Sequence, residues 1–324
     1  MVDKLAHMLF GLMLLGALPV YAQQYPSKVI TIIVPFAAGG PTDTVARLLA
    51  QAMGTTLKQQ IIVENIGGAG GTIAANRVAK AAPDGYTLLI HHIGHSTAPA
   101  LYRKLPYDAI NDFEPIGLIN EVPMTMVAKL NFPPKDLKAM IAYVKGNKDA
   151  VTYANAGLGA ASHLCGMLFM SAIETDVTTV PYKGTGPAMN DLLGGQVDFM
   201  CDQTVNTTSQ IKAGKIKVYG VTTKKRVPSL PNVPTMEEAG LPGFEVSVWH
   251  GLYAPKGTPK SVIDALSKAL QAALHDANVK RRFAELGSEP VPDNRATPAA
   301  LRAQLKAEID KWGPIIKKAG VYAD

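Results

Sequence analysis

With 324 residues, 32 Lys and Arg against 26 Asp and Glu, and a formal net charge of +6, the chain is mildly basic. Its positive charges are scattered. The densest cluster, Lys224–Arg226, contains no aromatic residue, which argues against the basic stripe with stacking aromatics that nucleic-acid binding needs. The length suits two domains, and a mild positive potential helps to attract small anions.

The chain begins with a stretch that has the features of a secretory signal peptide. Met8–Leu18 is an apolar run too short to span a bilayer, and the small residues Val20 and Ala22 flank Tyr21 where a signal peptidase would cut. We therefore expect residues 1–22 to be a signal peptide, cleaved near Ala22, and the mature protein to be exported. The alternative is an apolar N-terminal helix that packs on the core.

From Val29 the chain repeats a unit of strand, loop and helix. Val29–Val34 is a β-branched run, typical of a buried parallel strand. Two glycine-rich turns, residues 35–43 and 67–71, each lead from a strand into a helix. The pattern predicts strands at 29–34, 60–64 and 86–90 and helices at 44–53 and 72–81, the alternation of a doubly wound α/β sheet.

A second set of such units begins after Pro123. Strands are predicted at 124–129, 151–154, 177–180, 197–201 and 216–221, with helices at 137–145 and 162–173 and two more that end near 193 and 213. A strand at 244–254 then returns to the first set, and helices at 259–275, 278–286 and 298–318 complete it.

The predicted order of elements divides the mature chain into two α/β lobes, each a doubly wound sheet flanked by helices. One domain consists of residues 25–123 plus 250–324, and the other of residues 124–249. The chain crosses between them twice, near 118–123 and 247–251. Two crossings make a hinge, and we expect a ligand cleft between the domains.

The two cysteines, Cys165 and Cys201, each lie in an apolar stretch of an exported chain. An oxidising compartment permits a disulfide between them. Free cysteine in apolar surroundings behaves as a small hydrophobe, and we favour two buried thiols over a bridge.

The loops that follow the strands carry the strongest functional signal. Helix N-termini with glycine-rich approaches present free N–H groups and a positive dipole end, which bind an anion without Arg or Lys. Thr42, Ser162 and Thr185 are placed to add hydroxyl donors, while Asp43 is either a helix cap or a ligand contact. A single such loop is equally well an ordinary turn with its cap, but recurrence in two lobes favours a shared anion site.

Other chemistries are poorly supported. The segment 67–71 lacks the spacing of a dinucleotide or phosphate loop, and Ser162 and His163 are adjacent, so their side chains diverge on a helix. His91, His92 and His95 cluster after a strand and could ligate a metal, but no partner stands at ligand spacing. We expect instead that one of these histidines lines the cleft while another is a solvated or a core imidazole.

Six ordered motifs resemble those of the tripartite tricarboxylate transporter receptors, also called Bug or TctC-like solute-binding proteins. They lie at residues 35–43, 65–71, 83–89, 105–108, 162–164 and 181–184, so that the resemblance covers nearly the whole mature chain. It implies a periplasmic two-lobed "Venus flytrap" without enzymatic activity, cofactor, metal or catalytic residue. We expect a monomer that delivers a small carboxylate to membrane permease subunits. The alternative from another class is an exported α/β hydrolase acting on a carboxylate or ester.

The resemblance also implies which residues bind the ligand. By position they are Phe36, Ala38, Gly39, Gly40, Thr42, Asp43, His95, Ser96, Ala156, Gly157, Ala161, Ser162, His163, Tyr182, Lys183, Gly184, Thr185 and Asp202. Many members have proline where Ala38 stands and more hydroxyls than the loop 155–161 offers. This more apolar loop suggests a ligand with an apolar body, for example an aromatic dicarboxylate such as terephthalate.

Overall fold

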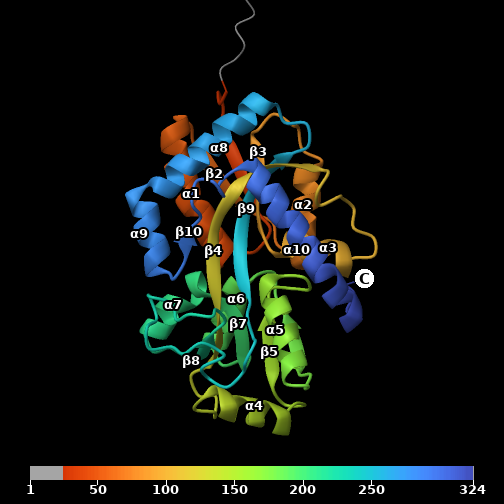
Figure 1. Cartoon of the computed structure of the whole chain (residues 1–324), viewed down its shortest axis with the longest axis vertical. Coiled ribbons are helices and arrows are strands. Elements are labelled where there is room, and N and C mark those ends of the chain that lie inside the picture. The colour runs from red at the N-terminus through yellow and green to blue at the C-terminus, as the bar shows by residue number, and fades with distance from the viewer. Residues whose placement is uncertain (1–24, 324) are drawn as a thin grey trace, which may run out of the picture.

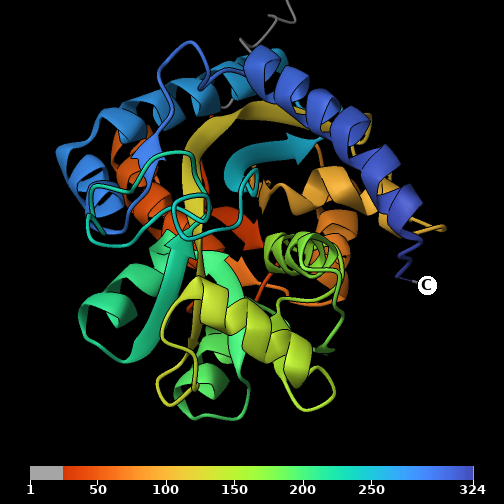
Figure 2. The same cartoon turned by 60° about the horizontal axis from the view of Figure 1, so that its bottom comes forward.

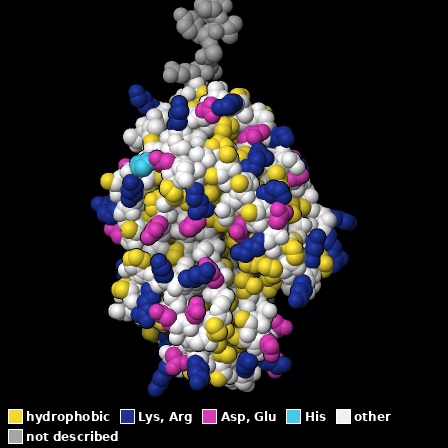
Figure 3. All heavy atoms as spheres, in the orientation of Figure 1, with side chains coloured by type: hydrophobic (Ala, Val, Ile, Leu, Met, Phe, Trp, Pro, Cys, Tyr) yellow, Lys and Arg dark blue, Asp and Glu magenta, His cyan; other side chains and the backbone are white. Residues whose placement is uncertain are grey.

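The computed structural model describes residues 25–323 (Figure 1). The predicted signal peptide, residues 1–22, lies outside the described residues. Over residues 25–323, each helix is too short or too polar to cross a bilayer. Figure 3 shows Lys and Arg side chains intermixed with Asp and Glu over one face of the molecule, so that neither sign of charge forms a stripe there.

The first lobe is built on a mixed sheet. Three parallel strands are followed by one strand that is antiparallel to them, and then by a last strand that is antiparallel to that one. Its strands, in spatial order, are β2 (Ile61–Asn65), β1 (Ile30–Val34), β3 (Thr87–His92), β9 (Ser247–Pro255) and β4 (Phe113–Lys129), with the short β10 (Glu289–Pro290) beside β4. The sequence of β1 is apolar except for Thr31, since helices cover both faces of this sheet; Ile30, Ile32, Ile33 and Val34 are all fully buried.

Six α-helices and one 3₁₀ turn of the described chain surround this sheet. They are α1 (Pro41–Leu57), the 3₁₀ turn η1 (Ala69–Gly71), α2 (Thr72–Ala79), α3 (Gly94–Leu101), α8 (Lys260–His275), α9 (Ala277–Glu285) and α10 (Pro298–Ala319). Figure 2 shows α8 and α10 running along the outer side of the curled β4 and β9 strands. The C-terminal helices therefore pack on the first sheet, although they follow the second lobe in sequence.

The second lobe has a smaller sheet that shares strand β4. Its other strands are β7 (Phe199–Gln203), β5 (Thr152–Asn155), β6 (Thr178–Pro181) and β8 (Ile216–Val221), and its helices are α4 (Leu137–Gly146), α5 (Ala161–Ala172), α6 (Thr185–Leu193) and α7 (Thr204–Lys212). Strands β5, β6 and β7 are parallel, while β7 and β8 run antiparallel to β4. The two-lobed α/β prediction is confirmed.

Strand β4 is much longer than the predicted strand at 124–129. Its first part pairs with β9 from Phe113 to Pro123, and its last part pairs with β7 from Met124 to Ala128. The predicted strand began only after Pro123, a residue that lacks the N–H that a ladder needs. The ladder accommodates its interruptions with two register shifts, one of which lies at Pro115. The division of the chain at residues 123 and 249 remains a prediction.

The cysteines correct the prediction of two thiols. Cys165 on α5 and Cys201 on β7 are both fully buried, as expected, but they form a disulfide. Helix α5 packs directly on β7 and brings the two Cα atoms to 6.1 Å, a separation that a disulfide spans. The disulfide therefore links helix α5 covalently to strand β7 of the same lobe.

Candidate ligand-binding cleft

One cavity lies between the lobes where several helices begin. Its free space is about 280 Å³, part of it open to solvent. The lining residues come from both lobes; they are Phe36, Gly40, Pro41, Thr42, His92, Ala156, Ala161, Ser162, Thr185, Asp202 and Gln203. Eight of these eleven residues were predicted as ligand-binding. The other three, Pro41, His92 and Gln203, were not.

Three of the helices that begin at the cavity contribute residues of their first turn to its lining, and a fourth begins beside it. These helices are α1, α5 and α6, and α7 starts directly after the lining residue Gln203. Within the described chain, no side chain caps the N-terminus of any of the four. Their first N–H groups and positive dipole ends are therefore directed to the cleft without an internal partner from a capping side chain.

Of the described helices that do not begin at the cavity, α4, α9 and α10 are capped by side chains, whereas α2, α3 and α8 are not. The Asp136 and Asp276 carboxylates accept hydrogen bonds from N–H groups at the starts of α4 and α9, and the Thr297 hydroxyl accepts one at the start of α10. At the cleft, the N-cap positions of α1, α5 and α6 are occupied by the small residues Gly40, Ala160 and Gly184. Backbone donors can reach an anion there without obstruction.

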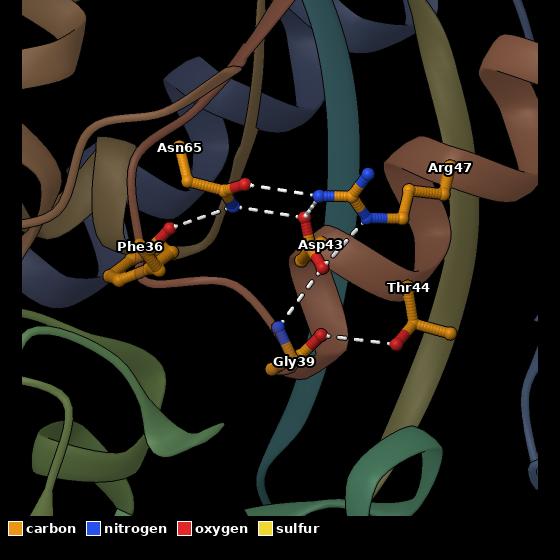
Figure 4. Close-up of polar contacts among 7 residues, drawn as sticks. Phe36, Gly39, Asp43, Thr44, Arg47 and Asn65 are labelled. Carbon is orange, nitrogen blue, oxygen red and sulfur yellow. Dashed lines mark hydrogen bonds and ion pairs between the residues drawn. The ribbon is translucent and has the colours of Figure 1, made fainter. Parts of the chain in front are cut away.

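The loop before α1 is held in place by Asp43 (Figure 4). Its carboxylate accepts hydrogen bonds from the Gly39 N–H at 3.0 Å, the Asn65 amide at 2.9 Å and the Arg47 guanidinium at 2.9 and 3.0 Å. Burial alone would raise the pKa of Asp43, but the bonds from Arg47, Gly39 and Asn65 outweigh it and hold the pKa below its usual value. Asp43 therefore shapes the loop and does not line the cavity.

This arrangement also corrects the predicted cap. Helix α1 begins at Pro41 rather than at Thr44, so Asp43 is its third residue and Gly40 occupies the N-cap position. The Asp43 side chain bonds a backbone N–H in the preceding loop instead of one in the first turn. Asn65, at the end of β2, completes the network by donating to the Phe36 carbonyl at 3.0 Å.

The second lobe supplies two hydroxyls and a buried carboxylate. The Ser162 hydroxyl oxygen accepts the Ala156 N–H at 2.9 Å, which leaves its proton free to be donated. Burial raises the pKa of the Asp202 carboxyl to about 6, although hydrogen bonds from Asn206, Gln203 and Thr185 lower it. Asp202 is the one charged side chain among the described residues that line the cavity.

The three clustered histidines do not share one environment, and the predicted ligand residue His95 is not the one at the cavity. His92 lines the cavity, with its ring stacked on Phe36 at a centroid distance of 4.6 Å. His91 and His95 lie in the core, and the structure moves His95 and Ser96 away from the predicted ligand site. The Nε2 atom of His95 bonds the Ala109 carbonyl, and the Ser96 hydroxyl donates to the Ile93 carbonyl. Over residues 25–323, no group of His, Cys, Asp or Glu side chains could hold a metal ion.

Burial lowers the pKa of each of these histidines, to about 3 for His92 and about 4 for His95. The rings are therefore neutral at physiological pH. His163 behaves in the same way: burial lowers its pKa to about 4, and its Nδ1 atom accepts the Gly159 N–H at 3.3 Å. It stands in the first turn of α5 but does not line the cavity.

The remaining predicted residues lie where the lobes touch. The Ala37 N–H of the first lobe donates to the Lys183 carbonyl of the second at 2.8 Å. A side chain at Gly184 would come within 2.9 Å of the Ala37 nitrogen, and one at Gly186 would come within 2.8 Å of the Ala38 carbonyl. Ala38 and Gly39 are exposed at this rim, and the Tyr182 hydroxyl donates to Asp191 at 2.7 Å, away from the cavity.

The second glycine-rich loop, residues 67–71, also contacts the opposite lobe. A Cβ atom on Gly70 would lie 1.9 Å from the carbonyl oxygen of Leu158 in the second lobe. Gly157 of the same lobe also packs against Gly70. Close by, the Thr97 hydroxyl donates to the Gly159 carbonyl at 2.9 Å, across the same interface. This loop brings the two backbones into contact and does not line the cavity.

A larger groove of about 1070 Å³ lies elsewhere between the lobes. It is lined by the middle of β4, the segment after β8, and the α9–β10 turn, and it includes Arg226, Ser288 and Arg295. Arg226 pairs with Glu238, and Arg295 pairs with Glu121. The helix N-termini described above open onto the smaller cavity, and we therefore place the ligand site there.

Two lobes joined by two strands, with helix N-termini from both lobes at one cavity, define a solute-binding protein. The chain belongs to a particular family of them. The model of the tripartite tricarboxylate transporter family receptor matches residues 45–321, which confirms the resemblance seen in the motifs.

Three solved structures of this kind are similar to the chain over nearly its whole length. The structure of the periplasmic binding protein BugD is 55% identical, with a TM-score of 0.90, over 92% of this chain and 99% of that one. MatC from Rhodopseudomonas palustris with bound malate is 45% identical, with a TM-score of 0.87, over 90% and 100%. A second R. palustris protein, with adipate, is 34% identical, with a TM-score of 0.87, over 92% and 99%.

Proposed function

We propose that this protein binds a small dicarboxylate in the cleft between its lobes, in the periplasm, and delivers it as a monomer to the permease of a tripartite transporter. The observation that carries the proposal is the set of uncapped helix N-termini, from both lobes, at one cavity. These N–H groups stabilise a carboxylate without a cationic side chain, and neither Lys nor Arg is among the described lining residues. The signal peptide would direct export and be cleaved near Ala22.

The chemistry of the lining and the relatives supports the ligand class. Two of the relatives named above were solved with malate and adipate, both aliphatic dicarboxylates. An aromatic dicarboxylate such as terephthalate is our second candidate, because the stacked Phe36 and His92 rings and the apolar side chains of Ala156 and Ala161 border the same cavity.

Binding is coupled to the hinge in this proposal. The ligand's carboxylates bridge the N-termini of α1 on the first lobe and α5 and α6 on the second, so that it binds the closed arrangement more tightly than an open one. Differential affinity of this kind shifts the population toward the closed form. The lobes that move are residues 25–123 with 250–324 and residues 124–249.

A calorimetric and thermal-shift screen tests the proposal. We expect one or more of succinate, malate, adipate and terephthalate to raise the melting temperature and to bind with a stoichiometry of one, because a ligand specific for the folded state stabilises it. Hydrolysis of a bound ester would support the exported hydrolase instead. A flat response to mono-, di- and tricarboxylates alike would overturn the binding proposal.

A further inference from the structure

A chain of buried hydrogen bonds runs from the hinge to the cleft. The Thr42 hydroxyl lies 3.2 Å from His250 Nε2, and His250 Nδ1 lies 2.9 Å from the Asn120 side-chain oxygen. The Asn120 amide nitrogen donates to the Ser288 hydroxyl at 2.9 Å, and Ser288 donates to the Glu121 carbonyl at 3.2 Å. The four side chains are at most 2% exposed, and Asn120 and His250 belong to the two strands that join the lobes.

The direction of every bond in this chain follows from its last member. The Glu121 carbonyl has no proton, so the Ser288 hydroxyl must donate to it and can only accept from Asn120. The Asn120 amide nitrogen therefore faces Ser288, and its oxygen faces His250. An oxygen in that position requires a proton on His250 Nδ1.

The same reasoning fixes the bond at the cleft. Burial, with a smaller contribution from His92, holds the pKa of His250 well below its usual value, so the ring is neutral and carries one proton. With that proton on Nδ1, Nε2 is an acceptor, and the hydroxyl that meets it must donate. The Thr42 hydroxyl thus donates its only proton to His250. Toward a ligand in the cleft, the Thr42 oxygen can therefore act only as a hydrogen-bond acceptor.

Two neighbours of Thr42 extend this acceptor character. The Gln203 side-chain oxygen is buried at the cavity and has no hydrogen-bond partner among the residues that the structure describes. The Asp202 carboxylate lines the same cavity. Ser162 has the opposite polarity, because its oxygen is occupied by the Ala156 N–H and its proton is free. The cavity therefore offers a ligand both donors, at Ser162 and the helix N-termini, and a group of acceptors.

We propose that His250, fixed by Asn120, makes Thr42 a hydrogen-bond acceptor and so makes the cleft select dicarboxylates that carry a hydroxyl or ammonium group over those that carry neither. His250 is a positioning residue in this scheme, since it acts through Thr42. The inference rests on the proposed function, because selection among dicarboxylates requires that dicarboxylates bind.

Binding of three related ligands measures the selection. Malate and aspartate add a hydroxyl and an ammonium group, respectively, to succinate, and the ratio of their Kd values on one protein sample does not depend on how much of that sample is folded. We expect the wild type to prefer malate, aspartate or both over succinate by about 10-fold, the effect of one hydrogen bond. The ligand with the larger preference over succinate, malate or aspartate, shows whether a hydroxyl or an ammonium group is the donor that the cleft selects.

Variants place the preference on the hydrogen-bonded chain. Thr42→Val should reduce the ratio to about 1, and Thr42→Ser, which keeps the hydroxyl, should retain it. Asn120→Leu removes the acceptor that fixes the ring, so that His250 can donate to Thr42 and the ratio should fall as it does in Thr42→Val. A preference that survives Thr42→Val or Asn120→Leu in a folded protein would overturn the inference.

The tautomer of His250 is a readout independent of any ligand. In protein labelled with ¹⁵N-histidine, we expect the His250 signals to show a protonated Nδ1 and an unprotonated Nε2, and to disappear in His250→Gln, which assigns them. A protonated Nε2 would overturn the inference even if dicarboxylates bind. Equal binding of the three ligands, or binding of none of them by a protein that binds another dicarboxylate, also overturns it and leaves the proposed function standing. A flat response to every carboxylate in the screen contradicts both.

Discussion

Two glycine-rich loops follow neighbouring parallel strands of the first lobe, yet they do different things. The loop Phe36–Gly40, after β1, ends at the cavity and leads into the uncapped N-terminus of α1. The loop Gly67–Gly71, after β2, contacts the backbone of the second lobe and does not line the cavity. Similar composition thus serves ligand approach in one loop and lobe contact in the other.

The space around the glycines explains the difference. Gly40 has an ordinary backbone conformation, and a Cβ atom there would be 3.5 Å from its nearest neighbour, Gly186 N. Gly70 has a φ of +59°, and a Cβ atom there would be 1.9 Å from the Leu158 carbonyl oxygen. Glycine at position 70 is therefore required by the opposite lobe, whereas glycine at position 40 leaves room for something else to approach.

The largest effect is expected from Gly70→Ala. The added methyl group collides with the Leu158 carbonyl only when the lobes are together, so it should disfavour the closed form and weaken ligand binding by about 100-fold, as a differential cost of about 3 kcal/mol implies. Isothermal titration with a ligand found in the screen measures this change.

The matched control for that variant is Gly214→Ala. Gly214 has a similar φ of +66°, but a Cβ atom there would meet nothing within 4 Å. It therefore reports the backbone cost of alanine in the left-handed region, roughly 1–2 kcal/mol of stability, without the collision. Equal affinity losses in both variants would show that the loop Gly67–Gly71 does not limit closure.

The next effect concerns Asp202, a charged side chain that lines the cavity, whereas the loop Gly67–Gly71 contains no charged residue. Because burial raises the pKa of Asp202 from 3.8 to about 6, the folded protein keeps a proton there that the unfolded chain has lost between those pH values. The Asp202 contribution to stability should therefore fall as pH rises from about 4 to 6, by up to about 3 kcal/mol.

Urea unfolding of the wild type and Asp202→Asn at several pH values isolates this contribution. The variant lacks the titrating group, so the difference in unfolding free energy between the two proteins should decrease with rising pH and level off above about 6. Parallel profiles would contradict the assigned pKa. Asp43, whose pKa is lowered, contributes the opposite slope to both proteins and cancels in the difference.

A smaller effect is expected from Ser162→Ala in the cleft. The variant removes a donated proton and leaves the Ala156 N–H without its acceptor, so we expect ligand affinity to fall by about 10-fold. Ser171→Ala, at an exposed position of the same helix, is the matched control and should leave affinity unchanged. A loss of the same size in the control would assign the effect to helix α5 as a whole.

The smallest effect is expected from Gly40→Ala, which makes the comparison of the two loops sharpest. The methyl group finds van der Waals contact at 3.5–3.7 Å and no strain, so affinity should change by about 2-fold or less. Gly40→Val carries two further methyl groups toward the cavity and should weaken binding several-fold by hindering backbone approach. Equal, large losses in Gly40→Ala and Gly70→Ala would mean that both loops serve closure.

The repeating pattern of the sequence was enough to predict the two lobes and most of their elements. Apolar runs such as Val29–Val34 locate strands because most of their side chains are buried, and glycine-rich turns locate the helix starts that face the cleft. Helix α3 was not predicted, since Gly94 and Pro99 read as helix breakers. Tertiary packing overrides that local preference, because α10 covers α3.

Contacts between distant segments set the limit of the prediction for the site. The disulfide depends on how α5 packs against β7, and nothing in the apolar stretches around Cys165 and Cys201 specifies that packing. His250 gave no signal at all, because it is one polar residue within a strand, and its role depends on Asn120, which is 130 positions away. Gln203 was absent from the predicted set because only the fold directs its side chain into the cavity.

The paired strands β4 and β9 have a mechanical consequence. They are hydrogen-bonded to each other from the Phe113–Pro255 pair to the Pro123–Ser247 pair, so the connection between the lobes is a ribbon rather than two separate flexible linkers. Any change in the angle between the lobes has to be absorbed as bend and twist of that ribbon while its ladder stays intact. Such a joint acts as a stiff spring with a limited range of rotation, and it returns the same two surfaces to register at every closure.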